Sequence, residues 1–190
     1  HRCRDVGGVI RWRPLTNGIA PTRSATSSSA SISEHCWTRW PRRPKGTALA
    51  FSIVLRPTAK ERPHLTRIVG LAALAAAKPL RERGLDARIK WPNDILIQNR
   101  KVCGILIESV WSGEDVDCVV IGTGINVLKG SVPPEEMLQF PATSLEAELG
   151  QAPDRVEILR DILASLIELR PRLATDEFLK QWEDLLALQG

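Results

Sequence analysis

The sequence has few cysteines and histidines, and it has no apolar run long enough to cross a bilayer. Its four cysteines, Cys3, Cys36, Cys103 and Cys118, form no Cys-x-x-Cys pair and have no histidine at metal-ligand spacing. The longest apolar candidate, residues 71–77, is rich in alanine and flanked by basic residues. The N-terminus has no apolar core followed by a cleavage-like site, so no secretory signal is visible. These absences predict a cytoplasmic protein with reduced thiols, and a Cys103–Cys118 disulfide is the alternative.

The whole chain has a net charge of +4, and its positive charge is concentrated in the first part of the sequence. Residues 1–45 hold nine Lys or Arg against two acids, whereas the remainder holds seventeen against twenty. A basic groove for DNA needs ordered elements that carry the charge, and no helix-turn-helix pattern is seen. We therefore expect neither nucleic acid nor a membrane as a partner.

Residues 1–45 also differ from the rest of the chain in composition. They show no apolar periodicity, contain a polar run at residues 26–29, and hold three of the six tryptophans. Such a segment buries too little apolar surface to offset the entropy lost by an ordered chain. The sequence predicts a folded domain over residues 46–190, preceded by a disordered or mis-framed segment over residues 1–45.

Apolar alternation and turn residues predict a β-meander within residues 46–190. Residues 48–55 are typical of a strand that is buried on at least one face. Short connections rich in turn-forming residues then join strands that must be antiparallel neighbours. These strands are expected over residues 86–91, 95–97, 101–109 and 116–122.

Three helices are expected to pack on this sheet and to make an α+β domain with an antiparallel or mixed sheet. The first covers residues 65–83 and ends at Gly84, with Pro79 kinking or splitting its last turns. The second begins after Asp154 and ends at Pro171, and the third covers residues 175–188. The apolar stripe of the second helix is expected to contain Val156, Leu159, Ile162, Leu163, Leu166 and Ile167.

Three motifs follow one another along the meander. Lys90-Trp91-Pro92-Asn93-Asp94 precedes Lys-Val-Cys-Gly-Ile-Leu-Ile-Glu at residues 101–108 and Gly-Thr-Gly-Ile-Asn-Val at residues 122–127. Their order and spacing resemble the biotin–protein ligase family, and Ala-Thr-Ser-Leu at residues 142–145 is similar to a further segment of it. The resemblance runs from about Gly46 to the C-terminus.

The resemblance implies the catalytic-domain fold of biotin and lipoate ligases, which is similar to class II synthetases. It also implies an ATP-dependent ligase that forms biotinyl-5'-AMP and transfers biotin to a lysine of a carboxylase biotin carrier domain. Biotin and ATP would be the small molecules bound, with Mg²⁺ accompanying the ATP. The carrier domain would be the protein partner, and the sequence leaves a homodimer open.

Lys90 is the residue expected to carry the chemistry. Pro92 fixes its own φ and favours an extended Trp91. Alternation along the strand then places Lys90 on the opposite face from Ile89 and Trp91. By resemblance Lys90 contacts biotin and the reacting phosphate, where an ammonium stabilises developing negative charge. The alternative is a surface lysine that extends into solvent from the end of a strand.

Glycines within the strands predict the close approach of a ligand. By resemblance biotin lies against the backbone at Gly104 with Ile105 alongside, and a β-bulge at Gly104 is the alternative. Gly122 and Gly124 allow ATP to approach the end of the last strand. Asn126 offers both a donor and an acceptor to adenine by resemblance, or else caps an ordinary turn.

The remaining candidates have weaker signals. Lys101 either helps to neutralise phosphate charge or only adds polarity to the hairpin. Trp91 is expected in the core. Asn93 and Asp94 either orient Lys90 or a magnesium-bound phosphate, or serve the turn alone. The three histidines have no nucleophile motif around them and are assigned no role, and no residue is assigned as a metal ligand.

One family feature is missing from the sequence. Biotin–protein ligases carry, before the first strand, a loop resembling Gly-Arg-Gly-Arg-x-Gly-Arg, whose amides and arginines cover biotin and the phosphate. Residues 33–42 instead read Ser-Glu-His-Cys-Trp-Thr-Arg-Trp-Pro-Arg. Codons for this stretch, displaced by one nucleotide, can spell Gln-Ser-Thr-Ala-Gly-Arg-Gly-Gly-Arg. The hypothesis is that residues before about Lys45 are translated out of frame.

The missing loop predicts weak or no ligase activity for the chain as written, because acyl phosphates survive only where water is excluded. Two other functions stay open, a non-catalytic remnant that binds biotin or nucleotide and a lipoate-type acyl ligase. The family usually adds a small β-barrel after the catalytic domain, and the chain stops at Gly190, where that module would begin.

Overall fold

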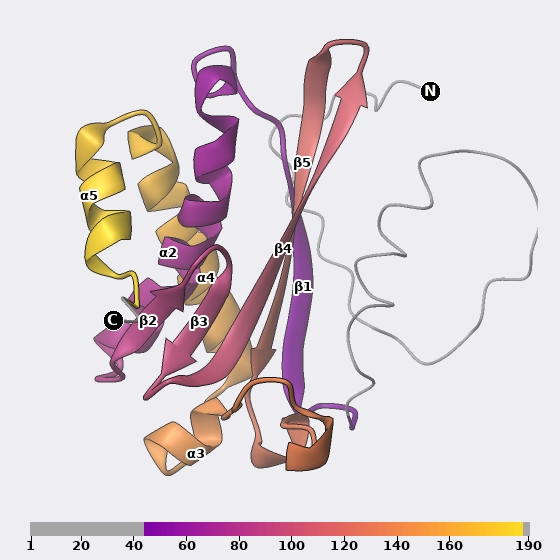
Figure 1. Ribbon diagram of the computed structural model, residues 1–190, viewed down its shortest axis with the longest axis vertical. Coiled ribbons are helices and arrows are strands. Elements are labelled where there is room, and N and C mark those ends of the chain that lie inside the picture. The colour runs from indigo at the N-terminus through magenta and orange to yellow at the C-terminus, as the bar shows by residue number, and fades with distance from the viewer. Residues whose placement is uncertain (1–43, 188–190) are drawn as a thin grey trace, which may run out of the picture.

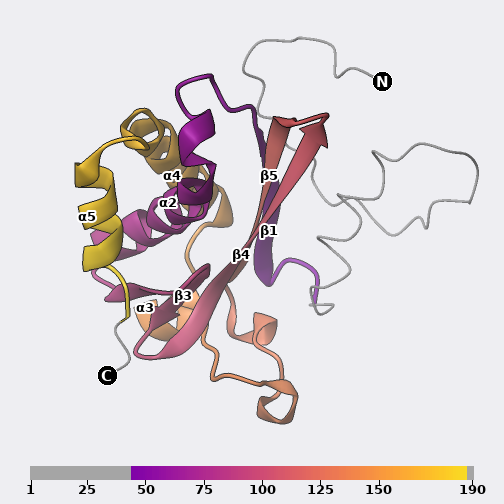
Figure 2. The ribbon, with the colours of Figure 1, turned by 45° about the horizontal axis from the view of Figure 1, so that its top comes forward.

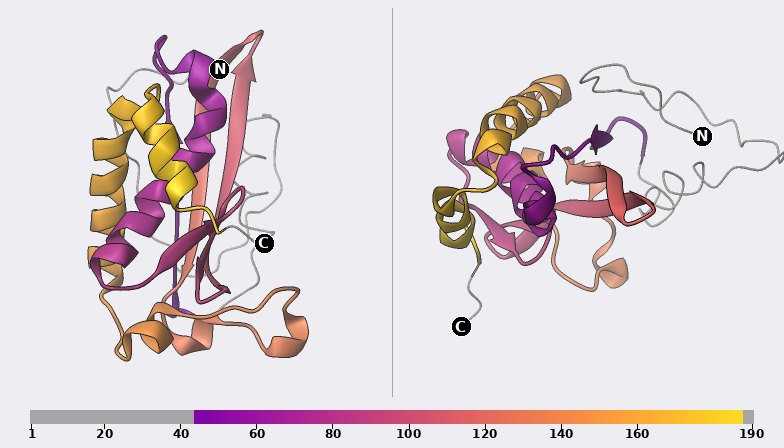
Figure 3. Two further views of the ribbon diagram at one scale, coloured as in Figure 1. Left: turned by 60° about the vertical axis from the view of Figure 1, so that its left-hand side comes forward. Right: turned by 90° about the horizontal axis from the view of Figure 1, so that it is seen from above.

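The computed structural model describes residues 44–187. Within them a five-stranded antiparallel sheet has helices α2, α4 and α5 on one of its faces (Figures 1 and 3), which confirms the α+β prediction. The predicted disordered or mis-framed segment at residues 1–45 lies outside the described residues, except for Pro44 and Lys45. Within the described range, no helix combines the length and the apolar character that a bilayer crossing demands.

The strands are paired in the order β1-β5-β4-β3-β2, and every pair is antiparallel. Their bounds are β1 Ala48–Leu55, β2 Ala87–Lys90, β3 Asp94–Ile97, β4 Arg100–Ser112 and β5 Asp115–Asn126. The meander from β2 to β5 confirms the prediction from the short connections. The sequence pattern did not predict that β1 lies beside β5, because this contact joins segments far apart along the chain.

The helices differ from the predictions mainly at their ends. The bounds are α2 Ile68–Glu82, α3 Leu145–Leu149, α4 Arg155–Leu169 and α5 Asp176–Asp184, with short 3-10 turns η1 Arg62–Arg67, η2 Lys129–Ser131, η3 Glu135–Met137 and η4 Arg170–Arg172. Helix α2 runs through Pro79 as one element, so Pro79 does not split its last turns, and the alternative of a kink there stays a prediction. Gly84 follows the helix with φ +83°, as expected for a left-handed residue at a helix end.

Helix α4 begins where the sequence predicts but turns a slightly different face to the core. The Asp154 carboxylate accepts a hydrogen bond from the Val156 amide at 2.7 Å. Val156 and Ile167 are 71% and 61% exposed, so placing them in the apolar stripe was wrong. The buried stripe consists of Ile158, Ile162, Leu166 and Leu169. Its members recur at helical spacing and therefore lie on one side of α4. Helix α4 packs against α2.

The chain after α5 closes the edge of the sheet at β2. The helix ends at Asp184 rather than at the predicted Leu188, and the next residues turn back toward β2. The Ile89 amide donates to the Leu185 carbonyl at 2.7 Å, and the Ala187 amide donates to the Ile89 carbonyl at 2.7 Å. Main-chain pairing of this kind satisfies groups that an edge strand would otherwise leave open.

The core lies between the sheet and the helices. One rung of paired residues on this face is buried almost throughout and contains Leu49, Ile125, Cys103, Ile95 and Ile89. Burial raises the pKa of the Cys103 thiol to about 12, which suits a structural cysteine rather than a nucleophile. No disulfide joins Cys103 to Cys118, so the disulfide alternative was wrong.

An ion pair between Glu61 and Arg170 ties the connection after β1 to the end of α4. The Arg170 guanidinium donates to both carboxylate oxygens, at 2.7 and 2.9 Å, and the Glu61 side chain is only 13% exposed. The Arg170 hydrogen bond lowers the pKa of Glu61 from 4.5 to about 2. A carboxyl group whose pKa is lower in the folded state stabilises the fold above its unfolded pKa and loses that contribution as the pH falls.

Substituting Glu61→Gln is therefore expected to lower the free energy of unfolding at pH 7 by about 1–2 kcal/mol. The loss should shrink as the pH falls from 4.5 toward 2, because the carboxyl of the unfolded state takes up its proton over this range while the native carboxylate stays ionised until the pH nears 2. Urea denaturation at several pH values measures this loss in the free energy of unfolding. Glu114→Gln on the exposed hairpin turn is the matched control. Equal pH dependence in the Glu61 variant and the unsubstituted chain would contradict the assignment.

Candidate functional site

One rung of paired residues crosses the whole sheet on the face away from the helices. It contains Lys90, Asp94, Gly104, Gly124 and Ala50, in that order across the strands. Residues that pair directly in a sheet carry their side chains on the same face. Because the adjacent rung packs beneath the helices, alternation places the rung of Lys90 on the opposite face.

Small residues make up most of this face near Lys90. Two positions further along the strands, the rung Ser52, Gly122 and Leu106 continues the same surface. Gly104 pairs regularly with Asp94 and Gly124, and the sheet's register shifts lie elsewhere, so the β-bulge alternative at Gly104 was wrong. Glycine and alanine put no side chain longer than a methyl over the strand backbone, which permits close approach of a flat ligand.

Ile105 lies on the other face of the sheet from Gly104. Its side chain is 3% exposed and belongs to the core, so a ligand on the face of Gly104 could meet only the main chain of Ile105. Alternation along β4 is the physical reason. Both main-chain groups of Ile105 bond Asn93, whose carbonyl accepts at 2.9 Å and whose Nδ2 donates at 2.6 Å. Asn93 thus clamps the turn between β2 and β3 against β4.

Trp91 lies outside the core. Its side chain is 70% exposed, and the Trp91–Pro92 peptide bond is cis. The prediction that Trp91 would be buried was wrong because β2 ends at Lys90, so the alternation that buries Ile89 does not continue into the turn.

The two lysines predicted for the site have different surroundings. Lys101 Nζ lies 2.5 Å from Asp94 Oδ1, so its charge is neutralised by a carboxylate on the same rung as Lys90. Lys90 Nζ lies 4.0 Å from the centroid of the Phe140 ring. Within residues 44–187 no carboxylate oxygen comes within 4.0 Å of Lys90 Nζ. Lys90 is therefore the cation of this face whose charge is left for an incoming anion, and Asp94 orients Lys101 instead of Lys90.

Asn126 joins the end of β5 to the segment that follows it. The side chain is 7% exposed, and its Nδ2 donates to the Thr143 carbonyl at 2.9 Å. The next residue, Ser144, caps α3 by accepting from the Ala147 amide at 3.3 Å. The Ala-Thr-Ser-Leu segment thus has a structural role beside Asn126, and Asn126 retains its side-chain oxygen as an acceptor.

Three residues of this face were not singled out from the sequence. Ala50 and Ser52 could have been found, because alternation along residues 48–55 puts them on the face opposite Phe51. Phe140 could not, because its contact with Lys90 joins distant parts of the chain. Among the described residues no group of three or more His, Cys, Asp or Glu could hold a metal ion.

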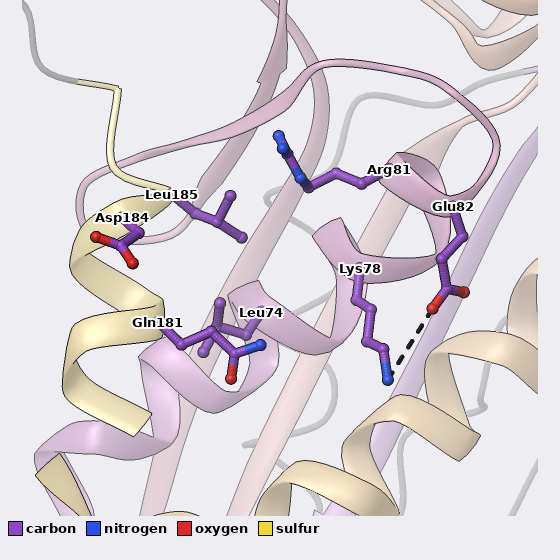
Figure 4. Close-up of a pocket in the computed structure, with 7 residues that line it drawn as sticks. All are labelled: Leu74, Lys78, Arg81, Glu82, Gln181, Asp184 and Leu185. Carbon is purple, nitrogen blue, oxygen red and sulfur yellow. Dashed lines mark ion pairs between the residues drawn. The ribbon is translucent and has the colours of Figure 1, made fainter. Parts of the chain in front are cut away.

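A groove of about 450 Å³ lies between α2 and α5, on the helical side of the domain (Figure 4). Its cations are already paired, since Lys78 lies 2.5 Å from Glu168 and Arg81 lies 3.0 Å from Asp86. The groove is separated from Lys90 by the sheet. We assign the candidate site to the face of Lys90 and not to this groove.

Comparison with known proteins places this geometry in context. Residues 35–126 match the model of the Biotin/lipoate A/B protein ligase family. The chain is 38% identical over 122 residues to the bifunctional ligase/repressor BirA of Bacillus subtilis, covering 63% of this chain and 37% of that protein. It is 38% identical over 121 residues to the biotin–[acetyl-CoA-carboxylase] ligase of Paracoccus denitrificans, covering 60% and 49%. The chain thus spans less than half the length of these relatives.

Solved structures are similar over a larger part of the chain. The biotin protein ligase of Aquifex aeolicus in complex with biotin and ATP is 31% identical, with a TM-score of 0.62 over 74% of this chain and 59% of that one. A biotin protein ligase-like protein of unknown function from Silicibacter is 14% identical with a TM-score of 0.61, which supports the fold alone.

Proposed function

We propose that this chain carries a catalytic domain of the biotin–protein ligase family, which activates biotin with ATP and transfers it to a protein lysine. The observation that carries the proposal is the rung that places Lys90, without a described carboxylate partner, on the same face as Gly104 and Gly124. A cation beside a flat, small-residue surface suits a substrate that pairs an anionic group with a compact ring system.

In the first step of the proposed reaction, a carboxylate oxygen of biotin bonds to the α-phosphorus of ATP, and the bond to pyrophosphate breaks. Negative charge accumulates where the two anions meet, and the Lys90 ammonium would lower the barrier by stabilising that charge. Holding both substrates against the glycines would contribute by alignment. Biotin would lie against Gly104, and ATP toward Gly122, Gly124 and Asn126.

In the second step, the amine of a lysine on a carboxylase carrier domain attacks the acyl carbonyl of biotinyl-5'-AMP. AMP leaves, and the amine loses a proton as the amide bond forms. Mg²⁺ would accompany the phosphates of ATP. Among residues 44–187 no group of three or more His, Cys, Asp or Glu could hold this ion. Asp94 is committed to Lys101, which would stand next to the phosphates as a neutralised pair.

A non-catalytic binder of biotin or nucleotide is the second candidate, favoured by the absence of the glycine and arginine-rich loop at residues 33–42. Such a protein would keep the binding face and lose the barrier to water that an acyl phosphate needs. Release of pyrophosphate from ATP in the presence of biotin separates the two functions.

The ligand class is tested by binding rather than by turnover. A non-hydrolysable mimic of biotinyl-5'-AMP and its lipoyl counterpart should be titrated into the full chain by calorimetry. The biotin mimic is expected to bind at least about 10-fold more tightly, which corresponds to about 1.4 kcal/mol. Preference for the lipoyl mimic, or binding of neither, would contradict the assignment to biotin.

A further inference from the structure

The segment between β5 and α3 brings an aromatic ring to the candidate cation. This segment, residues 127–144, loops past the end of the sheet where β4 begins (Figures 1 and 2). The Phe140 ring meets the Lys90 ammonium, with 4.0 Å between Nζ and the ring centroid. At this distance the negative face of the ring attracts the cation.

The ring is held in place by main-chain bonds of the residues that directly follow it. The Lys101 amide donates to the Pro141 carbonyl at 2.7 Å, and the Thr143 amide donates to the Lys101 carbonyl at 2.9 Å. Residues 141–143 thereby lie beside the start of β4 and pair with Lys101. Strand β5, which pairs with the following part of β4, ends at Asn126. The Asn126 side chain fixes the same segment through its bond to the Thr143 carbonyl.

A ring is a suitable partner for a cation that must receive an anion. A carboxylate would cancel the charge, as Asp94 does for Lys101, and an incoming phosphate would have to break that ion pair. An aromatic face attracts the ammonium without cancelling its charge, and it occupies one side only. The ammonium keeps N–H donors free for oxygens of a ligand.

We infer that Phe140 is a positioning residue for Lys90. Its ring would hold the ammonium on the face of Gly104 and Gly124 before substrates arrive, so that no reorganisation is needed when charge develops. Asn126 would act on Lys90 through the same segment, in addition to any contact of its own with a nucleotide. This inference rests on the proposed function, since it assumes that Lys90 receives an anionic ligand.

The contact itself is tested without any ligand. In the full chain, ring currents should shift the NMR signals of the Lys90 side-chain methylenes, assigned by comparison with Lys90→Met. Phe140→Leu, which keeps an apolar side chain, should abolish the shift, whereas Phe140→Trp should preserve one. Met137→Ala, an exposed apolar residue of the same segment, should leave it unchanged. A Lys90 shift that persists in Phe140→Leu would overturn the inference.

The consequence for binding is tested with the non-hydrolysable biotinyl-5'-AMP mimic. Phe140→Leu should weaken its binding by about two- to fivefold, and Phe140→Trp should not. In a Lys90→Met background the same change should have no further effect, because Phe140 acts through Lys90. A loss of the same size in both backgrounds would show a merely structural role and overturn the inference. If the mimic binds no form of the chain, the proposed function fails, and the NMR shift still decides whether Phe140 holds Lys90.

Discussion

Replacing residues 34–42 with Gln-Ser-Thr-Ala-Gly-Arg-Gly-Gly-Arg is expected to raise the rate of biotin transfer by about 100-fold or more. Loss of even one donor that stabilises developing charge costs about 100-fold in rate, and the replaced stretch would restore several amides and arginines at once. It would also shield the acyl phosphate from water, which the sequence as written is not expected to do. Mass spectrometry of a carrier domain, incubated with biotin and ATP, measures the transfer.

The matched control is the same nine residues in scrambled order, which keeps charge and composition but separates the glycines from the arginines. Its activity should stay at the level of the chain as written. Rapid transfer by the unaltered chain would contradict the proposal that residues before about Lys45 are out of frame. So would a DNA sequence that encodes this segment as printed in an intact frame.

Local patterns were sufficient to predict the meander. Alternation and short turns define β2 to β5, because antiparallel neighbours joined by a few residues have almost no other way to pair. The same reasoning placed Lys90 on the face opposite Ile89, and the structure confirms it through the rung that joins Lys90 to Asp94 and Gly104.

An error arose where alternation was extended beyond the end of an element. Trp91 was expected to share the buried face of Ile89, but the strand stops one residue earlier and the side chain is 70% exposed. Ile105 was grouped with its neighbour Gly104 because the two are adjacent in a motif, and only its main chain can share that face because adjacent residues in a strand face opposite ways. A motif records which residues occur together and not which way they point.

Long-range contacts lay beyond the reach of the sequence pattern. The position of β1 beside β5, the return of residues 185–187 to β2, and the meeting of Phe140 with Lys90 all depend on the folded chain. None of them has a local signal, since each joins segments separated by other elements. The chemistry of the site therefore could be predicted in outline, whereas the environment of its central cation could not.

Substituting Lys90→Met in the chain with the restored loop is expected to slow formation of biotinyl-5'-AMP by about 100- to 1000-fold. Methionine keeps an unbranched apolar stem and removes the ammonium that would meet the carboxylate and the α-phosphate. The effect should appear in the maximal rate more than in the concentration of ATP that gives half of it, because the charge develops in the transition state. Release of pyrophosphate in a coupled assay measures it.

The size of this loss relative to that of two other lysines tests the electrostatic argument. Lys60→Met removes an exposed cation from the connection after β1 and should leave the rate unchanged. Lys101→Met removes a cation that Asp94 already neutralises, so it should cost less than Lys90→Met. If Lys101→Met proved the more damaging change, the unneutralised charge on the rung would not be what drives the reaction. The catalytic cation would then have to be sought in the Lys101–Asp94 pair.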